Sequence, residues 1–343
     1  MTPRRFADIV GQEQPIEQLR AAALADRFPH ALLFAGPPGV GKATMASVLA
    51  RGILCAKPTG IDACGTCESC LLMDAGTHPD FHVADRQLVR LEKADSAARD
   101  LSIDVIRKYV VEPANRTAVL GRGKAFIIEE AERMNASAQN ALLKTLEEPL
   151  GRTVLVLLTD KPDLLLPTIR SRCQRVSFAP LPVEAVQGLL RARGHDPGLS
   201  SSAATIAEGS VGLALRWIED GVVQRHDELT RLLDDVWQAR VSATMLVDFL
   251  QRGVNDYLEK QRSRDKLVSE NQTMREGLGV YLQLASRHLR LALADPSRAN
   301  ELGFLCRGID AIAEAERNVL ASVNVALVLL QLCSALRRAR PDR

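Results

Sequence analysis

The chain has 343 residues, which is enough for two or three compact domains. Apolar residues make up 46% of it and charged residues 25%, as is typical of a soluble globular protein. The net charge of +2 excludes a protein that binds DNA through a large excess of positive charge alone, although it excludes neither nucleic acid nor acidic partners.

A helix, a strand, a glycine-rich loop and a second helix are expected in succession near the N-terminus. The first helix runs from Ile16 to about Ala25, and the continuous apolar run "ALLFA" (31–35) is typical of a buried strand. The sequence "GPPGVGKAT" (36–44) follows, and a helix is expected from about Lys42 to Leu54. In this context the motif predicts a P-loop, whose backbone N–H groups bind phosphates. The expected nucleotide-binding residues of the loop are Gly36, Pro37, Gly39, Val40, Gly41, Lys42, Ala43 and Thr44.

One position of this loop departs from the P-loop pattern. Ala43 stands where a Ser or Thr hydroxyl would bind Mg²⁺, and Thr44 lies about 100° further round the helix. The loop can therefore accept ATP or ADP, but with weak Mg²⁺ coordination, and fast hydrolysis is not expected. The alternative is a glycine-rich turn without a ligand.

Four cysteines are clustered directly after this helix, with the spacing C-x8-C-x2-C-x2-C. Two-residue spacers let neighbouring thiolates point at a common centre, and four thiolates complete a closed tetrahedral site for structural Zn²⁺. An iron–sulfur cluster is the chemical alternative. The expected ligands are Cys55, Cys64, Cys67 and Cys70. The remaining cysteines are scattered in apolar surroundings and are expected in the core; they are Cys173, Cys306 and Cys333.

Two further apolar runs, "AFII" (125–128) and "TVLVLL" (153–158), predict buried strands, with a helix at 135–148 between them. Alternating helices and wholly apolar strands predict a parallel sheet covered on both faces. Glu129 and Glu130 follow the first of these strands, where P-loop hydrolases carry acidic residues that position Mg²⁺ and activate water. Glu130 suits the water-activating role, whereas Glu129 is one methylene longer than the usual Asp. The alternative is a pair of solvated strand-end residues.

Only helical periodicity follows "CQRVSFAPL" (173–181), with breaks expected at Gly194, Gly209, Gly253 and Pro296. This pattern predicts an α/β P-loop domain at 1–178, a small helical domain at 179–222 and an all-helical domain at 223–343. The N-terminus lacks the apolar core of a signal peptide, and polar residues interrupt the late apolar stretch 323–336. We therefore expect a cytoplasmic protein without a membrane partner.

In this order, the segments resemble the bacterial clamp-loader subunits of the AAA+ class. The segments "NALLKTLEEP" (140–149) and "LLPTIRSRCQ" (165–174), which contains an "SRC" triplet, are highly specific to this family. The resemblance covers about the first two thirds of the chain closely. It implies an AAA+/RecA-like domain with an inserted zinc module, a helical lid and a helical collar. The other matching segments are "FADIVGQEQ" (6–14), "HALLFAGPPGVGK" (30–42), "GSVGLALRW" (209–217) and, more weakly, "SVNVALVLL" (322–330).

The family contains motor subunits of the gamma/tau type and subunits of the delta-prime type. Motor subunits have a complete P-loop, an Asp-Glu strand end and a nucleotide-sensing arginine in the lid. Ala43, Glu129 and Gly212 depart from that pattern at three places, so the chain resembles the delta-prime type. The resemblance implies that Arg172 of the "SRC" triplet acts in trans on the ATP of the next subunit, and that Thr159 matches a polar sensor beside the γ-phosphate. Glu130 would then be vestigial. The alternative for Arg172 is a structural salt bridge.

The resemblance also implies the partners. They are motor subunits and a delta subunit in a pentamer, the sliding clamp, and primed DNA through the complex. Such a chain would belong to a DNA-directed DNA polymerase holoenzyme without being an efficient ATPase itself. Two alternatives are an active gamma/tau-like motor and a zinc-dependent DNA-binding module. The cysteine segment disfavours the second, because Lys57 is the one basic residue between its first and last ligand.

Overall fold

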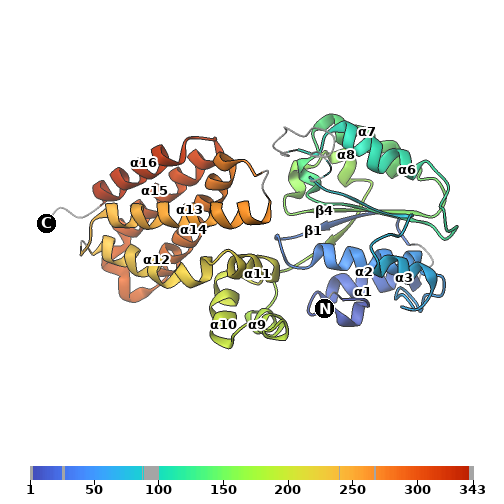
Figure 1. The fold of residues 1–343 in the computed structure, drawn as a ribbon, viewed down its shortest axis with the longest axis horizontal. Helices are drawn as coiled ribbons and strands as arrows, with labels where there is room; N and C mark the ends of the chain where they lie inside the picture. Colours follow the sequence, from blue (N-terminus) through green and yellow to red (C-terminus); the bar gives the residue numbers. More distant parts are fainter. Residues whose placement is uncertain are drawn as a thin grey trace. The chain divides into compact units, whose positions relative to one another are not determined.

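The computed structural model describes residues 3–24, 28–86, 88, 100–238, 240–265 and 268–339. The chain divides into two compact units, Met1–Ala214 and Leu215–Arg343 (Figure 1). The first unit contains a sheet and the helices that cover it, and the second is helical. The finer division of the chain at 178/179 and 222/223 stays a prediction.

The first unit is built on a five-stranded sheet, in which every pair of neighbouring strands is parallel. The strand order is β2-β3-β4-β1-β5, so the sheet is the predicted parallel one. The three middle strands are fully buried, as their apolar sequences require. The strands are β1 (Ala31–Ala35), β2 (Phe81–Ala84), β3 (Lys124–Ile128), β4 (Thr153–Thr159) and β5 (Gln174–Ser177).

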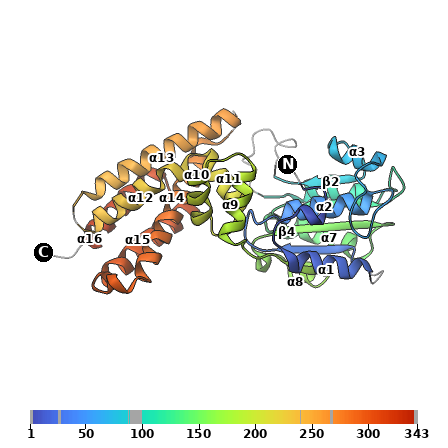
Figure 2. The ribbon, with the colours of Figure 1, turned by 90° about the horizontal axis from the view of Figure 1, so that it is seen from below.

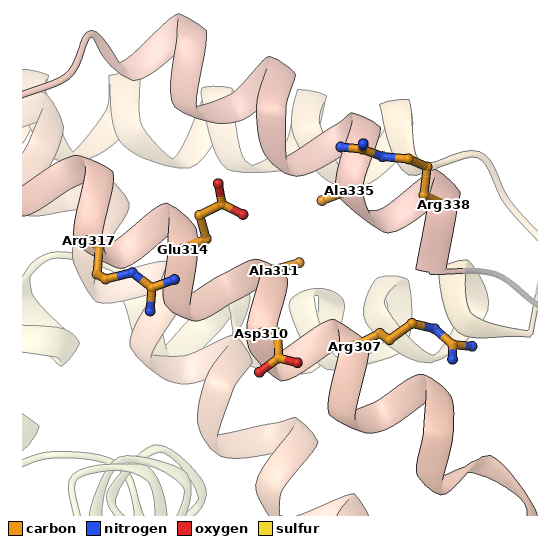
Figure 3. A pocket seen from close by; sticks show the side chains of 7 residues that line it. All are labelled: Arg307, Asp310, Ala311, Glu314, Arg317, Ala335 and Arg338. Carbon is orange, nitrogen blue, oxygen red and sulfur yellow. The ribbon is translucent and has the colours of Figure 1, made fainter.

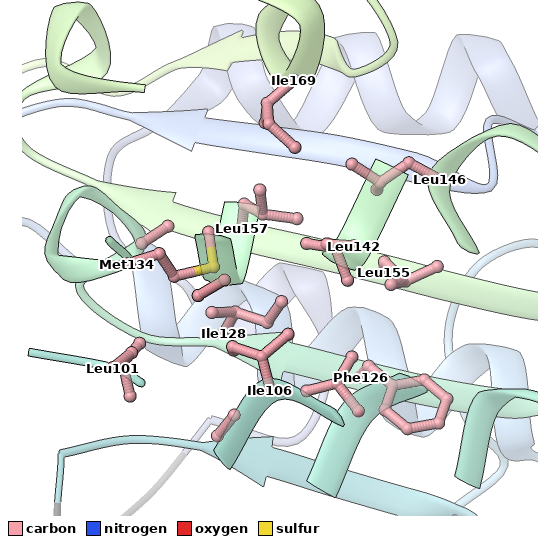
Figure 4. Packing of buried hydrophobic residues seen from close by; sticks show 14 of the residues in the cluster. Leu101, Ile106, Phe126, Ile128, Met134, Leu142, Leu146, Leu155, Leu157 and Ile169 are labelled. Atoms are coloured by element: carbon pink, nitrogen blue, oxygen red, sulfur yellow. The ribbon is translucent and has the colours of Figure 1, made fainter. Parts of the chain in front are cut away.

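Alternate residues of each middle strand point to opposite faces of the sheet, and helices cover both faces (Figure 1). Leu33 and Leu157 pack under α7 and α8, in the cluster that Figure 4 shows. Leu32 and Val156 pack on the other face, against α1 and α2. The helices of this part of the chain, on both faces, are α1 (Glu13–Leu24), α2 (Lys42–Leu54), α3 (Glu68–Asp74), α5 (Ile103–Ile106), a π-helical turn (Arg107–Val111), α6 (Glu112–Ala114), α7 (Ala136–Glu147) and α8 (Pro167–Arg170), with short 3₁₀ turns at Phe6–Asp8, Ala131–Arg133 and Pro162–Leu164.

Three helices follow the sheet: α9 (Val183–Ala192), α10 (Pro197–Ile206) and α11 (Val211–Glu219). The predicted breaks at Gly194 and Gly209 are confirmed, because both residues lie between helices with φ of +88° and +83°. Such left-handed backbone suits glycine. Asp196 caps α10 by accepting hydrogen bonds from two backbone N–H groups of its first turn.

Long helices form the second unit (Figure 2). Their apolar faces meet in a core that includes Leu229, Leu246, Leu282, Ile312 and Leu332. Among the described residues, no helix has both the length and the apolar character needed to cross a membrane. The helices are α12 (Val222–Trp237), α13 (Ala243–Arg264), α14 (Glu270–Leu293), a 3₁₀ segment (Pro296–Glu301), α15 (Leu302–Leu320) and α16 (Val325–Ala339).

The prediction that Gly253 breaks a helix is wrong. Gly253 lies in the middle of α13, where a Cβ atom would come within 2.6 Å of the Tyr281 ring on α14. The glycine therefore lets two helices approach closely, and packing outweighs its low helix propensity. The predicted break at Pro296 is confirmed, because this residue begins the 3₁₀ segment that follows α14.

Candidate functional site

The predicted nucleotide-binding residues come together at the carboxyl edge of the sheet. Gly36 follows β1, Thr159 ends β4 and Glu129 follows β3, and these three strands are neighbours. The carboxyl edge is where parallel α/β sheets bind ligands. The backbone N–H of Gly36 donates to the carbonyl of Thr159 at 3.2 Å, which joins the loop to β4.

The glycine-rich loop that is predicted to bind phosphate (residues 36–44, called the phosphate loop below) holds its own lysine. Lys42 Nζ donates to the carbonyl oxygens of Gly36 and Pro37, at 2.6 Å in each case. Burial lowers the pKa of Lys42, and the charges of Asp160 and Glu132 act in the opposite direction. Ala43 is exposed at the start of α2 and offers no oxygen to a metal. The ammonium group is therefore satisfied by backbone groups of its own loop.

The GSVG turn (residues 209–212) is attached directly to the phosphate loop. Ser210 Oγ donates to the carbonyl of Pro38 at 2.8 Å, and the N–H of Gly212 donates to the carbonyl of Gly39 at 2.9 Å. A Cβ atom at Gly212 would lie 2.8 Å from the Cα atom of Gly39. Position 212, where motor subunits are expected to carry arginine, therefore has no room for a side chain unless the loop moves.

The acidic strand end does not present two free carboxylates. Glu130 has a left-handed backbone (φ +47°), and its side chain forms ion pairs with Arg86 and Arg133. Glu129 is partly buried; burial, followed by the charges of Asp85 and Glu130, raises the pKa of its carboxyl group. The surroundings thus disfavour the charged form of Glu129, and two arginines already pair with Glu130.

Two carboxyl groups that the sequence reasoning missed lie near Lys42. Glu132 and Asp160 are close enough for each to influence the other, and the Thr159 hydroxyl lies beside Glu132. Burial raises the pKa of Glu132, Asp160 raises it further, and the Thr159 hydroxyl lowers it. Glu132 Oε2 and Asp160 Oδ1 are buried without a hydrogen-bond partner among the described residues. The sequence did hint at both residues, because each lies close to a predicted site residue. Asp160 directly follows Thr159, and Glu132 lies two residues beyond Glu130.

Arg172 lies at the opposite edge of the sheet. It precedes β5 by two residues, and β5 runs parallel to β1 with Gln174 beside Leu32, so Arg172 belongs to the amino-terminal edge. Arg172 Nε donates to Glu147 Oε1 at 2.6 Å, and a terminal nitrogen of the same guanidinium donates to the carbonyl of Thr168 at 3.0 Å. The fold therefore separates Arg172 from the predicted nucleotide-binding residues, which lie at the carboxyl edge of the sheet.

The four clustered cysteines converge as predicted. Their Sγ atoms all lie within 4.8 Å of one another, and three of the separations are 3.8, 3.9 and 4.0 Å. Four sulfurs around Zn²⁺, with Zn–S bonds of about 2.3 Å, would be about 3.8 Å apart, so the donor set and its spacing fit a tetrahedral metal. The residues are Cys55, Cys64, Cys67 and Cys70.

The surroundings act differently on the individual thiols: backbone N–H groups lower the pKa of Cys64, whereas burial raises the pKa of Cys55 and of Cys70. Cys55 Sγ accepts from the N–H groups of Lys57 at 3.3 Å and Cys64 at 3.2 Å. The N–H groups of Thr66 and Cys67 lower the pKa of Cys64 to about 5, which favours the thiolate that metals bind. Among the remaining cysteines, Cys173 is buried as predicted.

The prediction that Cys306 is a core residue is wrong, because its side chain is exposed on α15. Residues on either side of it, Leu305 and Gly308, take the buried positions of that helix. Cys333 is partly buried on α16.

Comparisons with known proteins identify the family. A family model described as "DNA polymerase III, delta subunit" matches residues 11–182. The delta' subunit of DNA polymerase III from Pseudomonas aeruginosa is 36% identical over 250 residues, which are 71% of each protein. The chain belongs to the DNA polymerase III delta' family. The delta' subunit of Escherichia coli K12 is 36% identical over 218 residues, which are 63% of each protein.

Other similar proteins lie outside the delta' family. The DNA polymerase III subunit gamma/tau of Mycobacterium tuberculosis is 35% identical over 188 residues. These are 55% of the present chain and 31% of the gamma/tau subunit. Among solved structures, the RuvB Holliday junction branch migration motor of Thermotoga maritima aligns with a TM-score of 0.44 and 16% identity, covering 96% of this chain and 90% of the other.

A groove between α15 and α16 is a second concave surface of this delta' family member (Figure 3). Its lining combines guanidinium and carboxylate groups, and it contains none of the residues singled out in the sequence. Gln331 on α16 donates to Glu314 on α15 at 2.5 Å, which joins the two helices beside the groove. The lining residues are Arg307, Asp310, Ala311, Glu314, Arg317, Ala335 and Arg338.

Proposed function

We propose that the chain is the delta-prime-type subunit of a DNA polymerase III clamp loader. In this role it joins motor subunits of the gamma/tau type and a delta subunit in a pentamer that loads the sliding clamp onto primed DNA. Its contribution is Arg172, which acts in trans on the ATP of a neighbouring motor subunit, while its own AAA+ P-loop does not support efficient hydrolysis. The similarity to subunits named delta' and gamma/tau supports this assembly.

The observation that carries the proposal is the separation of Arg172 from the phosphate loop of its own chain. The two lie at opposite edges of the sheet, and β1 alone has five residues, or about 16 Å of extended chain. The guanidinium therefore cannot serve its own nucleotide pocket. A head-to-tail assembly, in which one surface of a subunit meets a different surface of the next, brings such an arginine to a neighbour's pocket. A planar guanidinium there stabilises the charge that develops on the transferred phosphoryl group.

Four features of the pocket support a silent ATP site. Ala43 supplies no ligand for Mg²⁺, and Lys42 is held by carbonyl groups of its own loop. The GSVG turn is bonded to Pro38 and Gly39. Glu132 and Asp160 lie close enough to Lys42 to act on its pKa, and carboxylates there would oppose the charge of a nucleotide's phosphates in a partly buried site. ATP or ADP would bind there with weak Mg²⁺ coordination, if at all.

The cysteine module is proposed to hold structural Zn²⁺. The four thiolates leave no coordination position for substrate, so a metal there would stabilise the fold and would not catalyse a reaction. Ser69, next to Cys70, donates to the carbonyl of Leu54 at 2.7 Å and is 2.8 Å from His78 Nε2. These bonds connect the module to α2 and to the segment that leads into β2. We further propose that residues 179–222 act as the lid and residues 223–343 as the collar of the ring.

Reconstitution tests the proposed function. The chain is mixed with motor and delta subunits, and ATP turnover is measured with primed DNA and clamp. Arg172→Ala should leave the assembly intact and lower its DNA-stimulated ATPase activity by at least tenfold. This expectation is conservative, because loss of an arginine finger costs at least about 10³ in rate at a single site. Arg170→Ala, which removes a neighbouring arginine paired with Asp163, is the matched control and should have little effect. Equal activities of the Arg172→Ala assembly and the wild-type assembly would refute the arginine-finger role.

The isolated chain distinguishes the silent site from an active motor. We expect negligible ATP turnover, with or without Mg²⁺. A robust rate that is abolished by Lys42→Ala would instead identify a working motor. Tight DNA binding by the isolated chain, lost on metal chelation, would support the zinc-dependent DNA-binding module.

A further inference from the structure

The residue that holds Arg172 is Glu147, at the last position of α7. On the basis of the proposed function, we infer that Glu147 is a positioning residue, which aims the Arg172 guanidinium at the ATP of the neighbouring subunit. It acts through Arg172 and does not itself touch the nucleotide.

The contacts of Arg172 occupy one edge of its guanidinium and leave another free. Nε donates to Glu147 Oε1 at 2.6 Å, and one terminal nitrogen contacts the same oxygen. The other terminal nitrogen donates to the carbonyl of Thr168 at 3.0 Å. An arginine has five N–H donors, so these three contacts leave two for phosphate oxygens. The Arg172 side chain is 34% exposed, so a neighbour's phosphate can approach it.

The two ends of this contact are built on rigid elements. Leu146, beside Glu147, has its carbonyl 2.8 Å from His30 Nε2, which fixes the end of α7 against the start of β1. Gln139 of α7 is 3% exposed and accepts a hydrogen bond from the N–H of Leu166 at 2.8 Å, which joins α7 to the segment that carries Arg172. Cys173, the next residue, packs into the core under α7. Glu147 can therefore orient Arg172 with little movement of either backbone.

The exposure of the pair favours a positioning role over a structural one. The Arg172 side chain is 34% exposed and that of Glu147 is 46% exposed. Ion pairs with this exposure contribute little to stability. An arginine side chain, however, loses rotamer entropy when it is fixed, and a contact that fixes it beforehand removes this cost from the catalytic step.

The arrangement also predicts which property of Glu147 matters. Both nitrogens of the occupied edge contact Oε1, so a single acceptor oxygen holds the arginine. The amide oxygen of glutamine can replace Oε1, whereas alanine has no acceptor. Glu147→Gln should therefore retain the orientation that Glu147→Ala loses.

The test uses the complete reconstituted clamp loader with primed DNA and clamp. Glu147→Ala should lower the DNA-stimulated kcat about tenfold, since small misplacement of a catalytic group can cost up to about 10²-fold, and should leave KM for ATP unchanged. Glu147→Gln should keep at least half of the wild-type kcat. Glu148→Ala, an exposed neighbour in the same helix end, is the matched control and should behave as wild type.

The possible outcomes separate this inference from the proposed function. If Arg172→Ala lowers kcat but Glu147→Ala does not, the positioning role is wrong and the arginine finger stands. If Glu147→Ala and Glu147→Gln both raise kcat, the carboxylate restrains the arginine by its charge, and the inference is overturned. If Arg172→Ala has no effect, the proposed function itself fails. In the double variant, Glu147→Ala should add nothing to Arg172→Ala, and an additive loss would also contradict positioning.

Discussion

The backbone N–H of Gly212 donates a 2.9 Å hydrogen bond to the carbonyl of Gly39, which joins the GSVG turn to the middle of the phosphate loop. The contact depends on the absence of side chains at both positions. Gly39 has a φ of +73°, and a Cβ atom on it would lie 2.3 Å from Ser210 Oγ. Two glycines distant in sequence thus keep the turn and the loop in van der Waals contact.

Gly212→Ala should destabilise this contact. The new Cβ atom would lie 2.8 Å from Gly39 Cα, so backbone has to move, at a cost of about 1–3 kcal/mol. Urea unfolding of the full chain would measure the loss, and hydrogen exchange at Gly212 would show faster opening of the turn.

Gly188→Ala is the control for this substitution. Gly188 lies in α9, and a Cβ atom added there would have no neighbouring atom within 4 Å, so alanine should be neutral or stabilising by about 0.5–1 kcal/mol. An unfolding midpoint for Gly212→Ala equal to that of the wild type would mean that the turn does not fasten the loop.

Loss of one buried cysteine should release the metal. We expect one zinc per wild-type chain by elemental analysis, and less than one tenth of that in Cys70→Ser, because a tetrahedral site with three ligands binds Zn²⁺ far more weakly. Cys306→Ser removes an exposed thiol away from the cluster and should retain the metal. Chelation of the wild type should make the segment 55–78 sensitive to protease. Iron together with visible absorption would identify an iron–sulfur cluster instead.

Glu130→Gln should have little effect on catalysis. Arg86 and Arg133 already pair with this carboxylate, so it is poorly placed to activate water. The DNA-stimulated ATPase of the reconstituted assembly should therefore stay within about twofold of wild type, the change expected when no transition-state contact is lost. A loss of tenfold or more would show that Glu130 takes part in hydrolysis and would contradict a silent site.

The sequence predicted the middle of the sheet well, because a strand buried on both faces has a continuous apolar sequence. "ALLFA" is β1 itself, and "TVLVLL" lies within β4. The edge strand β2, "FHVA", was not anticipated. It has four residues, one neighbouring strand and an exposed Val83, so its sequence lacks the signal that burial imposes.

Local motifs in the site were likewise predictable, and long-range pairs were not. The phosphate loop and the cysteine cluster each occupy one short segment, and their spacing carries the chemistry. The pairing of Arg172 with Glu147 joins residues 25 positions apart and depends on where α7 ends. Glu132 follows β3 and Asp160 follows β4, so the two carboxyl groups are close only because these strands are neighbours in the sheet. Sequence patterns indicate that strands exist, but they do not fix which ones are neighbours.

The acid stability of the helical unit should depend on Asp234 of α12. This carboxylate is 3.2 Å from His288 Nε2 and from both terminal nitrogens of Arg298. Burial alone would raise the pKa of Asp234, but the hydrogen bonds and charges of these two partners outweigh it, so the pKa lies below its ordinary value of 3.8. A carboxyl group whose pKa is lowered on folding stabilises the protein above its unfolded pKa, and that contribution is lost as the pH falls through the folded value.

Asp234→Asn should therefore lower the free energy of unfolding at pH 7 by about 1 kcal/mol, a modest figure because the side chain is 35% exposed. The difference from wild type should persist down to about pH 5 and shrink below about pH 4, where this carboxyl begins to bind a proton in the unfolded wild-type chain. Urea titrations at pH 7, 5 and 3.5, followed by circular dichroism, measure it. Asp227→Asn, on the same helix but 82% exposed, is the control and should change stability little at any pH. A loss for Asp234→Asn that stays the same at pH 3.5 would show that shape and not charge sets its contribution.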